Sequence, residues 1–144
     1  MSTKLVITSA LAAIIGFSAL PASANSISIE QWGWSNTIGG SQDGRRNAIG
    51  IFQDGYKNHA TARQEGRRNV TAIGQEGRRN RGKTEQFGHD NAAGVGQFGT
   101  GHRAELFQYG DGNIAASVQV GRNCNAAAEQ RGNGNVAAIV QTCR

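Results

Sequence analysis

The sequence predicts an all-β protein, a β-solenoid of stacked strand–turn–strand rungs with the cross-β geometry of an amyloid. Three regularities predict this fold. Glutamine recurs at every eleventh position, eleven times in all. Glycine stands two residues after ten of these glutamines, and asparagine stands five residues after eight of them. Between these positions small, mostly apolar side chains alternate with mixed, often charged ones. A fixed period is typical of one structural unit stacked many times, so we expect the function to lie in the stack.

The first 24 residues are set apart from the repeats and predict an export signal. Lys4 supplies a positive start, residues 5–20 form an apolar run, and residues 21–24 offer the small side chains of a cleavage site. The run is shorter than the about 20 residues of a membrane span; an uncleaved anchor is the alternative. Cleavage after Ala24 would leave residues 25–144 as one repeat domain. Its formal charge would be +4, from 14 Lys and Arg against 10 Asp and Glu.

One repeat, residues 47–57, illustrates the predicted unit. The seven residues from Asn47 to Gln53 alternate, which indicates a strand with two different faces. The next four, Asp54 to Lys57, have glycine second and indicate a tight reversal, because glycine accepts positive φ without steric cost. The face that carries asparagine, isoleucine and glutamine is small and mostly apolar, and we assign it inward. The other face is mixed and often charged.

Strands joined by such short links run antiparallel, so two half-repeats of eleven residues make one rung of 22. Like strands then stack in parallel at about 4.8 Å, with residues 22 apart directly above one another. A side-chain amide has both a donor and an acceptor, so stacked Gln and Asn form ladders. The predicted ladder residues are Gln31, Gln42, Gln53, Gln64, Gln75, Gln86, Gln97, Gln108, Gln119, Gln130, Gln141, Asn36, Asn47, Asn58, Asn69, Asn80, Asn91, Asn113 and Asn135.

The unit Asn-x5-Gln-x-Gly-x2-Asn-x-Ala-x3-Gln resembles the curlin repeat, whose first position is usually serine. Residues 36–53 and 80–97 carry the pattern, with Ile49 and Ala93 at the position where the family usually has alanine. Through its eleven glutamines the resemblance covers all of residues 25–144. The pattern departs at His102 and Cys124, where asparagine is expected, and at Cys143, where glycine is expected.

The resemblance implies a subunit of curli, the functional amyloid fibres of bacterial surfaces that build biofilm matrix and mediate adhesion. It implies export to the periplasm, passage in an unfolded form through a dedicated outer-membrane pore with accessory factors, and polymerisation outside the cell. The implied partners are further copies of the chain, a second curlin subunit and the pore. Curlins include major fibre-forming subunits and minor nucleating subunits, and the sequence leaves both open.

We expect the stack to polymerise. The first and last strands present unpaired N–H and C=O groups, and no polar or helical cap flanks the repeats of the kind that keeps other solenoids monomeric. Head-to-tail addition onto such an end gives an open filament. The alternative is a monomeric β-solenoid adhesin that binds polyanions through its basic turns.

The turns are basic, because Gly-Arg-Arg-Asn occurs three times. The basic turn residues are Arg45, Arg46, Arg67, Arg68, Arg78 and Arg79. Acidic residues just before these glycines partly pair their charges. We interpret the arginines as solvated turn residues that keep the subunit soluble. The alternative is a basic edge for anionic surface polymers such as lipopolysaccharide, extracellular DNA or acidic polysaccharide. No specific nucleic-acid recognition is expected.

Cys124 and Cys143 are the only cysteines, and in an exported protein we predict that they form a disulfide. Cys143 is expected to stack over Gly121, and Cys124 closes the turn that Gly121 opens. The two thiols would then lie on adjacent rungs within reach of each other. Two free thiols or links between molecules are the alternatives.

The sequence predicts no catalytic, cofactor or metal site. His59, His89 and His102 occupy three different positions of the repeat with no other ligand nearby. Residues 94–99 match G-x-G-x-x-G, but the strand–turn–helix context of a dinucleotide site is lacking. No Ser/His/Asp or paired-carboxylate arrangement stands out. An enzyme is therefore the least favoured class, behind a structural subunit and a binding protein.

Overall fold

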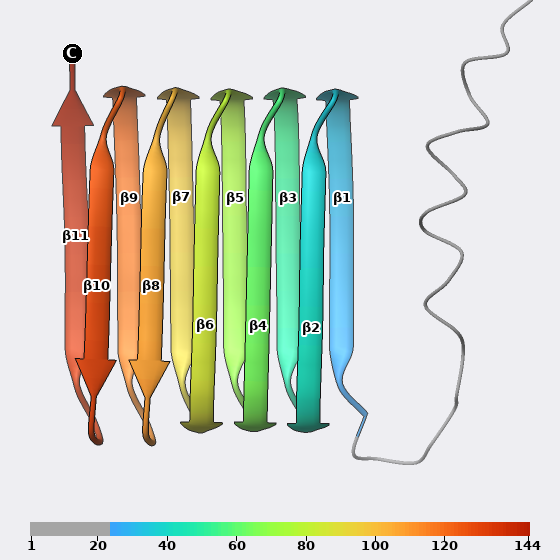
Figure 1. Ribbon diagram of the computed structural model, residues 1–144, viewed down its shortest axis with the longest axis vertical. Coiled ribbons are helices and arrows are strands. Elements are labelled where there is room, and N and C mark those ends of the chain that lie inside the picture. The colour runs from blue at the N-terminus through green and yellow to red at the C-terminus, as the bar shows by residue number, and fades with distance from the viewer. Residues whose placement is uncertain (1–23) are drawn as a thin grey trace, which may run out of the picture.

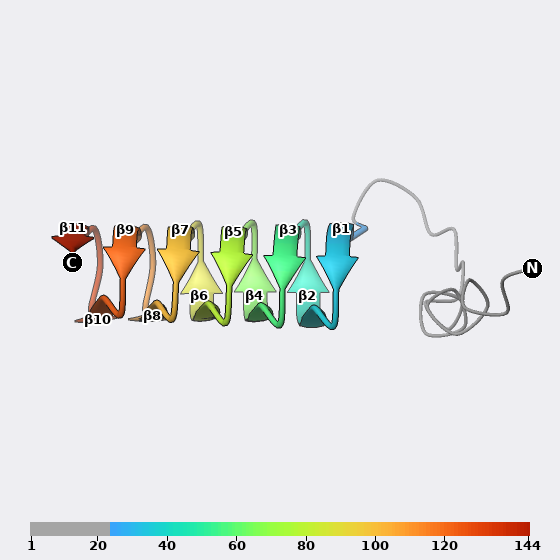
Figure 2. The ribbon, with the colours of Figure 1, turned by 90° about the horizontal axis from the view of Figure 1, so that it is seen from above.

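The computed structural model describes residues 24–144, in which the chain runs back and forth through eleven strands. Odd-numbered strands form one sheet of six, and even-numbered strands form a facing sheet of five (Figure 1, Figure 2). The strands are β1 (Ser26–Trp34), β2 (Thr37–Arg45), β3 (Ala48–Tyr56), β4 (His59–Arg67), β5 (Val70–Arg78), β6 (Arg81–His89), β7 (Ala92–Thr100), β8 (Arg103–Tyr109), β9 (Ile114–Arg122), β10 (Asn125–Arg131) and β11 (Val136–Cys143).

Within each sheet every strand pairs in parallel with the strand two places later in the chain. The register is constant, so that each residue lies beside the residue 22 positions further on, as Gln31 does beside Gln53 and Gly33 beside Gly55. Figure 1 shows each even-numbered strand set between two odd-numbered ones, half a rung along the stack. The prediction of an all-β solenoid with 22 residues per rung is confirmed.

The space between the two sheets holds a thin core. Ile49, Ile51 and Ile73 project into it from the six-stranded sheet, and Ala60 and Leu106 from the five-stranded sheet. Most of the other buried side chains are glutamine and asparagine amides. Small aliphatic side chains let the two sheets approach closely, and the amides take part in the stacking described below.

The turns differ from the predicted four-residue reversal. The strand that begins at Ala48 does not stop at Gln53 but continues through Gly55 to Tyr56. Only Lys57 and Asn58 separate it from the next strand. The reason is that Gly55 and Tyr56 still pair in register with the strands on both sides. The glycine bends the chain inside the strand with φ +122°, and the sheet extends into what the sequence suggested was a loop.

A second residue with positive φ, in the left-handed backbone region, completes each turn immediately before the asparagine position. Glycine occupies this place three times, at Gly101, Gly112 and Gly134. Elsewhere ordinary residues adopt φ values between 54° and 59°, and they are Ser35, Arg46, Lys57, Arg68, Arg79, Asp90 and Asn123. The second arginine of each Gly-Arg-Arg-Asn turn is thus held in a conformation that costs backbone energy.

The predicted export signal, residues 1–24, lies outside the described residues except for Ala24. Residues 24–144 contain no helix long and apolar enough to cross a membrane.

Candidate functional site

The glutamines form two columns of hydrogen bonds that run the length of the stack. From Gln31 to Gln119, each Nε2 donates to the Oε1 of the glutamine 22 residues later, at 2.7 to 3.0 Å. The glutamines between Gln53 and Gln119 are almost fully buried. All of these bonds point the same way, towards the C-terminal end, so each column has a polarity.

The second donor of each glutamine amide ties the two sheets together. Gln53 Nε2 donates to the backbone oxygen of Thr37 at 3.1 Å, and Gln64 Nε2 donates to that of Ala48 at 3.0 Å. The same bond to the residue sixteen positions earlier recurs along the stack from Gln42 to Gln141. Each interior amide therefore uses both N–H groups and its oxygen. The sequence analysis did not anticipate this contact across the core.

The asparagines stack by another route, through the backbone. Asn58 illustrates it: its N–H donates to Asn36 Oδ1 at 3.0 Å, and its Nδ2 donates to the carbonyl oxygens of Asp54 and Gly77 at 3.1 and 3.0 Å. The asparagine thereby closes its own turn and also holds the turn of the following rung. Direct side-chain bonds between asparagines occur at two pairs, from Asn91 to Asn69 and from Asn135 to Asn113.

His102 takes over the role of an asparagine in its column. Its N–H donates to Asn80 Oδ1 at 3.1 Å, and its Nδ1 accepts the N–H of Cys124 at 3.2 Å. Because Nδ1 is an acceptor, the proton of the neutral ring sits on Nε2, which donates to the Phe98 oxygen at 3.1 Å. The side chain is 1% exposed. The column therefore continues through a residue that the repeat pattern marked as a departure.

Cys124 and Cys143 are joined by a disulfide, with their Cα atoms 5.6 Å apart. The two cysteines are 19 residues apart in the sequence. In the other turns, an asparagine Nδ2 donates to the carbonyl oxygen of a glycine that is also 19 residues later, as Asn58 does to Gly77. The covalent bond thus stands where those turns have a hydrogen bond, and it fastens the end of β11 to the rung below.

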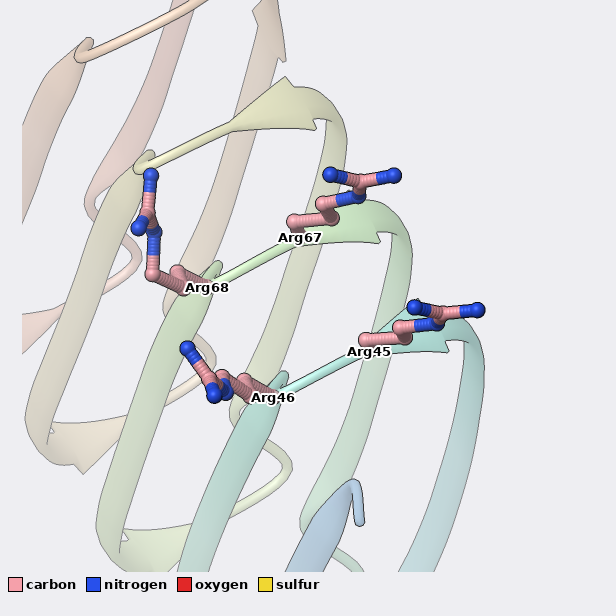
Figure 3. A pocket seen from close by; sticks show the side chains of 4 residues that line it. All are labelled: Arg45, Arg46, Arg67 and Arg68. Carbon is pink, nitrogen blue, oxygen red and sulfur yellow. The ribbon is translucent and has the colours of Figure 1, made fainter. Parts of the chain in front are cut away.

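The basic turns lie on two opposite edges. Arg45, Arg46, Arg67 and Arg68 line a shared pocket on one edge, each arginine directly above its counterpart 22 residues away (Figure 3). Arg78 and Arg79 belong to the turn between β5 and β6 on the opposite edge, where Arg78 stacks between Tyr56 and Thr100. The structure therefore brings together four of the six predicted basic residues.

Asp90 follows Arg46 and Arg68 at the same turn position, one rung further along the stack. Arg68 donates to both carboxylate oxygens of Asp90, from Nε to Oδ1 at 2.7 Å and from Nη2 to Oδ2 at 2.8 Å. The hydrogen bond and, to a lesser degree, the negative charge of Asp90 raise the pKa of Arg68. The positive charge of this edge is thereby concentrated around Arg45, Arg46 and Arg67.

Aromatic and cationic side chains stack on the outside of the five-stranded sheet. The rings of Phe87 and Tyr109 are parallel, with centroids 5.2 Å apart. The Arg131 guanidinium lies 5.5 Å from the Tyr109 ring centroid and pairs with Glu129. These residues follow the glutamines of β6, β8 and β10, so they form a third column parallel to the amides.

The two ends of the stack are complementary in polarity. At the first rung, Gln31 and Gln42 donate to the next rung, and no described residue donates to their Oε1 atoms. At the last rung, Gln130 and Gln141 donate only to the carbonyl oxygens of Ile114 and Asn125 among the described residues. One end therefore offers two acceptors and the other end offers two donors.

Residues 77–110 match the family model of the curlin-associated repeat. This match supports a curlin-type protein. No curated protein matches the sequence. The matched segment runs from the end of β5 to the residue after β8, and the same 22-residue register continues on both sides of it. Curlin-type proteins form a structural, non-enzymatic family located outside the cell or on its surface.

No group of three or more His, Cys, Asp or Glu side chains positioned to hold a metal ion occurs within residues 24–144. His59, His89 and His102 belong to three separate strands or turns, and His102 is engaged in its column. The arrangement as a whole offers repeated donors and acceptors along an axis.

Proposed function

We propose that this curlin-type protein is an exported structural subunit that polymerises by templated end addition into an extracellular curli-type fibre for adhesion and biofilm matrix. One observation carries the proposal: β1, β2, β10 and β11 each have a single strand partner among the described residues, and their columns of amides stand open. Unpaired strand edges are templates for another chain. Heterologous contacts between the two different ends generate an open filament.

The proposed route to the outside follows from the sequence and from the family. Residues 1–24 would direct export to the periplasm and be removed, and residues 25–144 would leave through an outer-membrane curli pore with its accessory factors. Folding against an existing fibre end would then convert the chain to strands. Besides its own copies, the proposed partners are the pore and a second curlin subunit.

The test is electron microscopy of residues 25–144, diluted from denaturant at neutral pH and sampled over hours, with sedimentation to follow the soluble fraction. Unbranched fibres that carry the cross-β spacing of about 4.8 Å are expected. A folded monomer that stays soluble would contradict the proposal. Adding the fibres in trace amounts to a second curlin then distinguishes a nucleating subunit, which shortens the lag of that curlin, from a bulk subunit, which does not.

A second candidate function rests on the pocket of Arg45, Arg46, Arg67 and Arg68. Four guanidinium groups on one edge of a soluble solenoid suit an anionic polymer such as lipopolysaccharide, acidic polysaccharide or extracellular DNA, bound without sequence preference. Binding of this kind weakens steeply with salt. It becomes the leading function if the chain remains monomeric.

A further inference from the structure

We propose that each copy in the fibre is turned by about half a revolution about the stack axis relative to the copy before it. In this joint, β1 of the second copy pairs with β10 of the first, and β2 of the second copy pairs with β11. The inference rests on the proposed function, because it assumes that copies add end to end. It specifies which surfaces meet and in which orientation.

The odd number of described strands leads to this joint. Successive strands alternate between the two sheets, and β11 ends in the six-stranded sheet. The next vacant place in the stack therefore lies on β10, in the five-stranded sheet (Figure 1). A half turn brings β1 of a second copy into that place, with its strand direction parallel to β10. Without the turn, β1 would pair with β11, and the place on β10 would stay empty.

The amide columns favour the half-turn joint because it leaves no amide at the joint without a partner. Gln130 and Gln141 have free Nε2 donors among the described contacts, and Gln31 and Gln42 of the second copy have free Oε1 acceptors. The half turn places Gln31 over Gln130 and Gln42 over Gln141. The joint without the turn satisfies Gln141 alone, and it leaves the Gln130 donor facing a gap.

The outer column of rings gives independent support. Phe87, Tyr109 and Arg131 stack in that order, and Arg131 is the last member on β10. In the half-turn joint, the next member is Trp32 of the second copy, which is 60% exposed at the open end of the stack. An indole over a guanidinium is a favourable cation–π pair. Without the turn, Trp32 would lie over Thr142 and the column would be interrupted.

The inward side chains also fit, since large residues meet small ones across the joint. The pairs, with the second copy first, are Ile27 over Ala126, Ile29 over Ala128, Ile38 over Ala137 and Gly40 over Ile139. Gly44 of the second copy lies over Cys143, whose sulfur is bonded to Cys124 in the rung below. Glu30 would lie over Glu129, a like-charge contact comparable with Arg81 beside Arg103 inside the stack.

Cysteine cross-linking between different copies tests the joint. Ser28→Cys and Ala127→Cys variants are mixed, assembled and oxidised, because the half turn puts these exposed outward positions directly beside each other. Ser28→Cys with Ala138→Cys is the matched control pair, which lies side by side only without the turn. We expect covalent dimers from the first pair, and none from the second pair or from any variant alone.

Fibres that cross-link through positions 28 and 138, or through neither pair, would overturn the half-turn joint while the proposed function stood. Failure of the unmodified chain to form fibres would overturn both. Helical reconstruction of unmodified fibres gives a second measurement that needs no variant. The half-turn joint requires a rise of about 26 Å per copy with a rotation near 180° beyond the twist of the stack, against about 29 Å and no added rotation without the turn.

Discussion

An interior glutamine makes three hydrogen bonds at once, and Gln75 is a representative case. It accepts from Gln53 at 2.7 Å, donates to Gln97 at 2.7 Å and donates to the oxygen of His59 at 3.0 Å. We expect Gln75→Ala to lower the denaturant concentration that dissolves the fibres, because each buried group left unsatisfied costs about 1–3 kcal/mol. Val70→Ala, at an outward position of the same strand, is the control. Equal effects of the two changes would show that the amide columns do not stabilise the stack.

The histidine in the asparagine column gives a second prediction at this scale. His102→Asn should be tolerated, because an asparagine there provides the same acceptor to Cys124 N–H and the same donor to the oxygen of Phe98. His102→Ala removes both contacts from a buried place and should cost about 1–3 kcal/mol. Hydrogen exchange of the Cys124 amide measures the difference directly. Protection that survives in the alanine variant would refute the assigned contact.

The turn elements depend on glycine wherever one turn lies directly beneath the next, as at Gly77. Gly77 has φ +122°, and a Cβ added to it would overlap the carbonyl oxygen of Gly99 in the next rung. Gly77→Ala should therefore slow assembly and destabilise the fibre by more than the about 1–2 kcal/mol of a left-handed alanine, because the overlap adds to that cost.

Gly50 provides the matched control, since it lies within β3 without a positive φ and a Cβ there would meet no atom within 4 Å. Gly50→Ala should leave assembly close to that of the parent chain. Thioflavin fluorescence and sedimentation, followed for both variants in parallel, check the contrast. If the two variants assembled alike, the close approach of successive turns would not be a property of the fibre.

Some features of the strands can be predicted from the sequence, and others cannot. The spacing of the glutamines fixes the register, and alternation such as that from Asn47 to Gln53 identifies a strand with one inward face, because both properties depend on period alone. The extension of β3 to Tyr56 is different: it arises from pairing with neighbouring strands on both sides. A residue in an isolated repeat carries no sign of that pairing.

The same distinction applies to the candidate site. Glutamines 22 residues apart stack because the register puts them there. The bond from Gln53 to the oxygen of Thr37 crosses the core, and it depends on the distance between the sheets. The acceptance of His102 in its column depends on which ring nitrogen faces Cys124. Composition and period do not specify either geometry, so three-dimensional coordinates are needed to find them.

At the scale of the whole molecule, the 22-residue register stacks some like charges directly on one another and separates others. On the edge of Arg45 and Arg67, like charges lie one rung apart in each molecule, whereas Arg78 on the opposite edge has Tyr56 and Thr100 as its stacked neighbours. Repulsion at a spacing of about 4.8 Å is well within the Debye length of about 30 Å at 0.01 M salt. The arginine edge therefore opposes the ordering of these turns most strongly at low ionic strength.

We expect the assembly lag to shorten when salt rises from about 0.01 M to about 0.15 M, where the Debye length falls to about 8 Å. Arg67→Gln should shorten the lag at low salt and flatten its salt dependence, because it removes the like charge that lies directly beside Arg45. Arg78→Gln changes the net charge equally but has no stacked like charge, so it should keep most of the salt dependence of the parent chain. Lag times measured by sedimentation across a salt series show whether repulsion between the stacked arginines or the net charge of the chain controls assembly. Identical behaviour of the two variants would show that net charge alone governs assembly, and the arginine edge would then have no separate role in timing it.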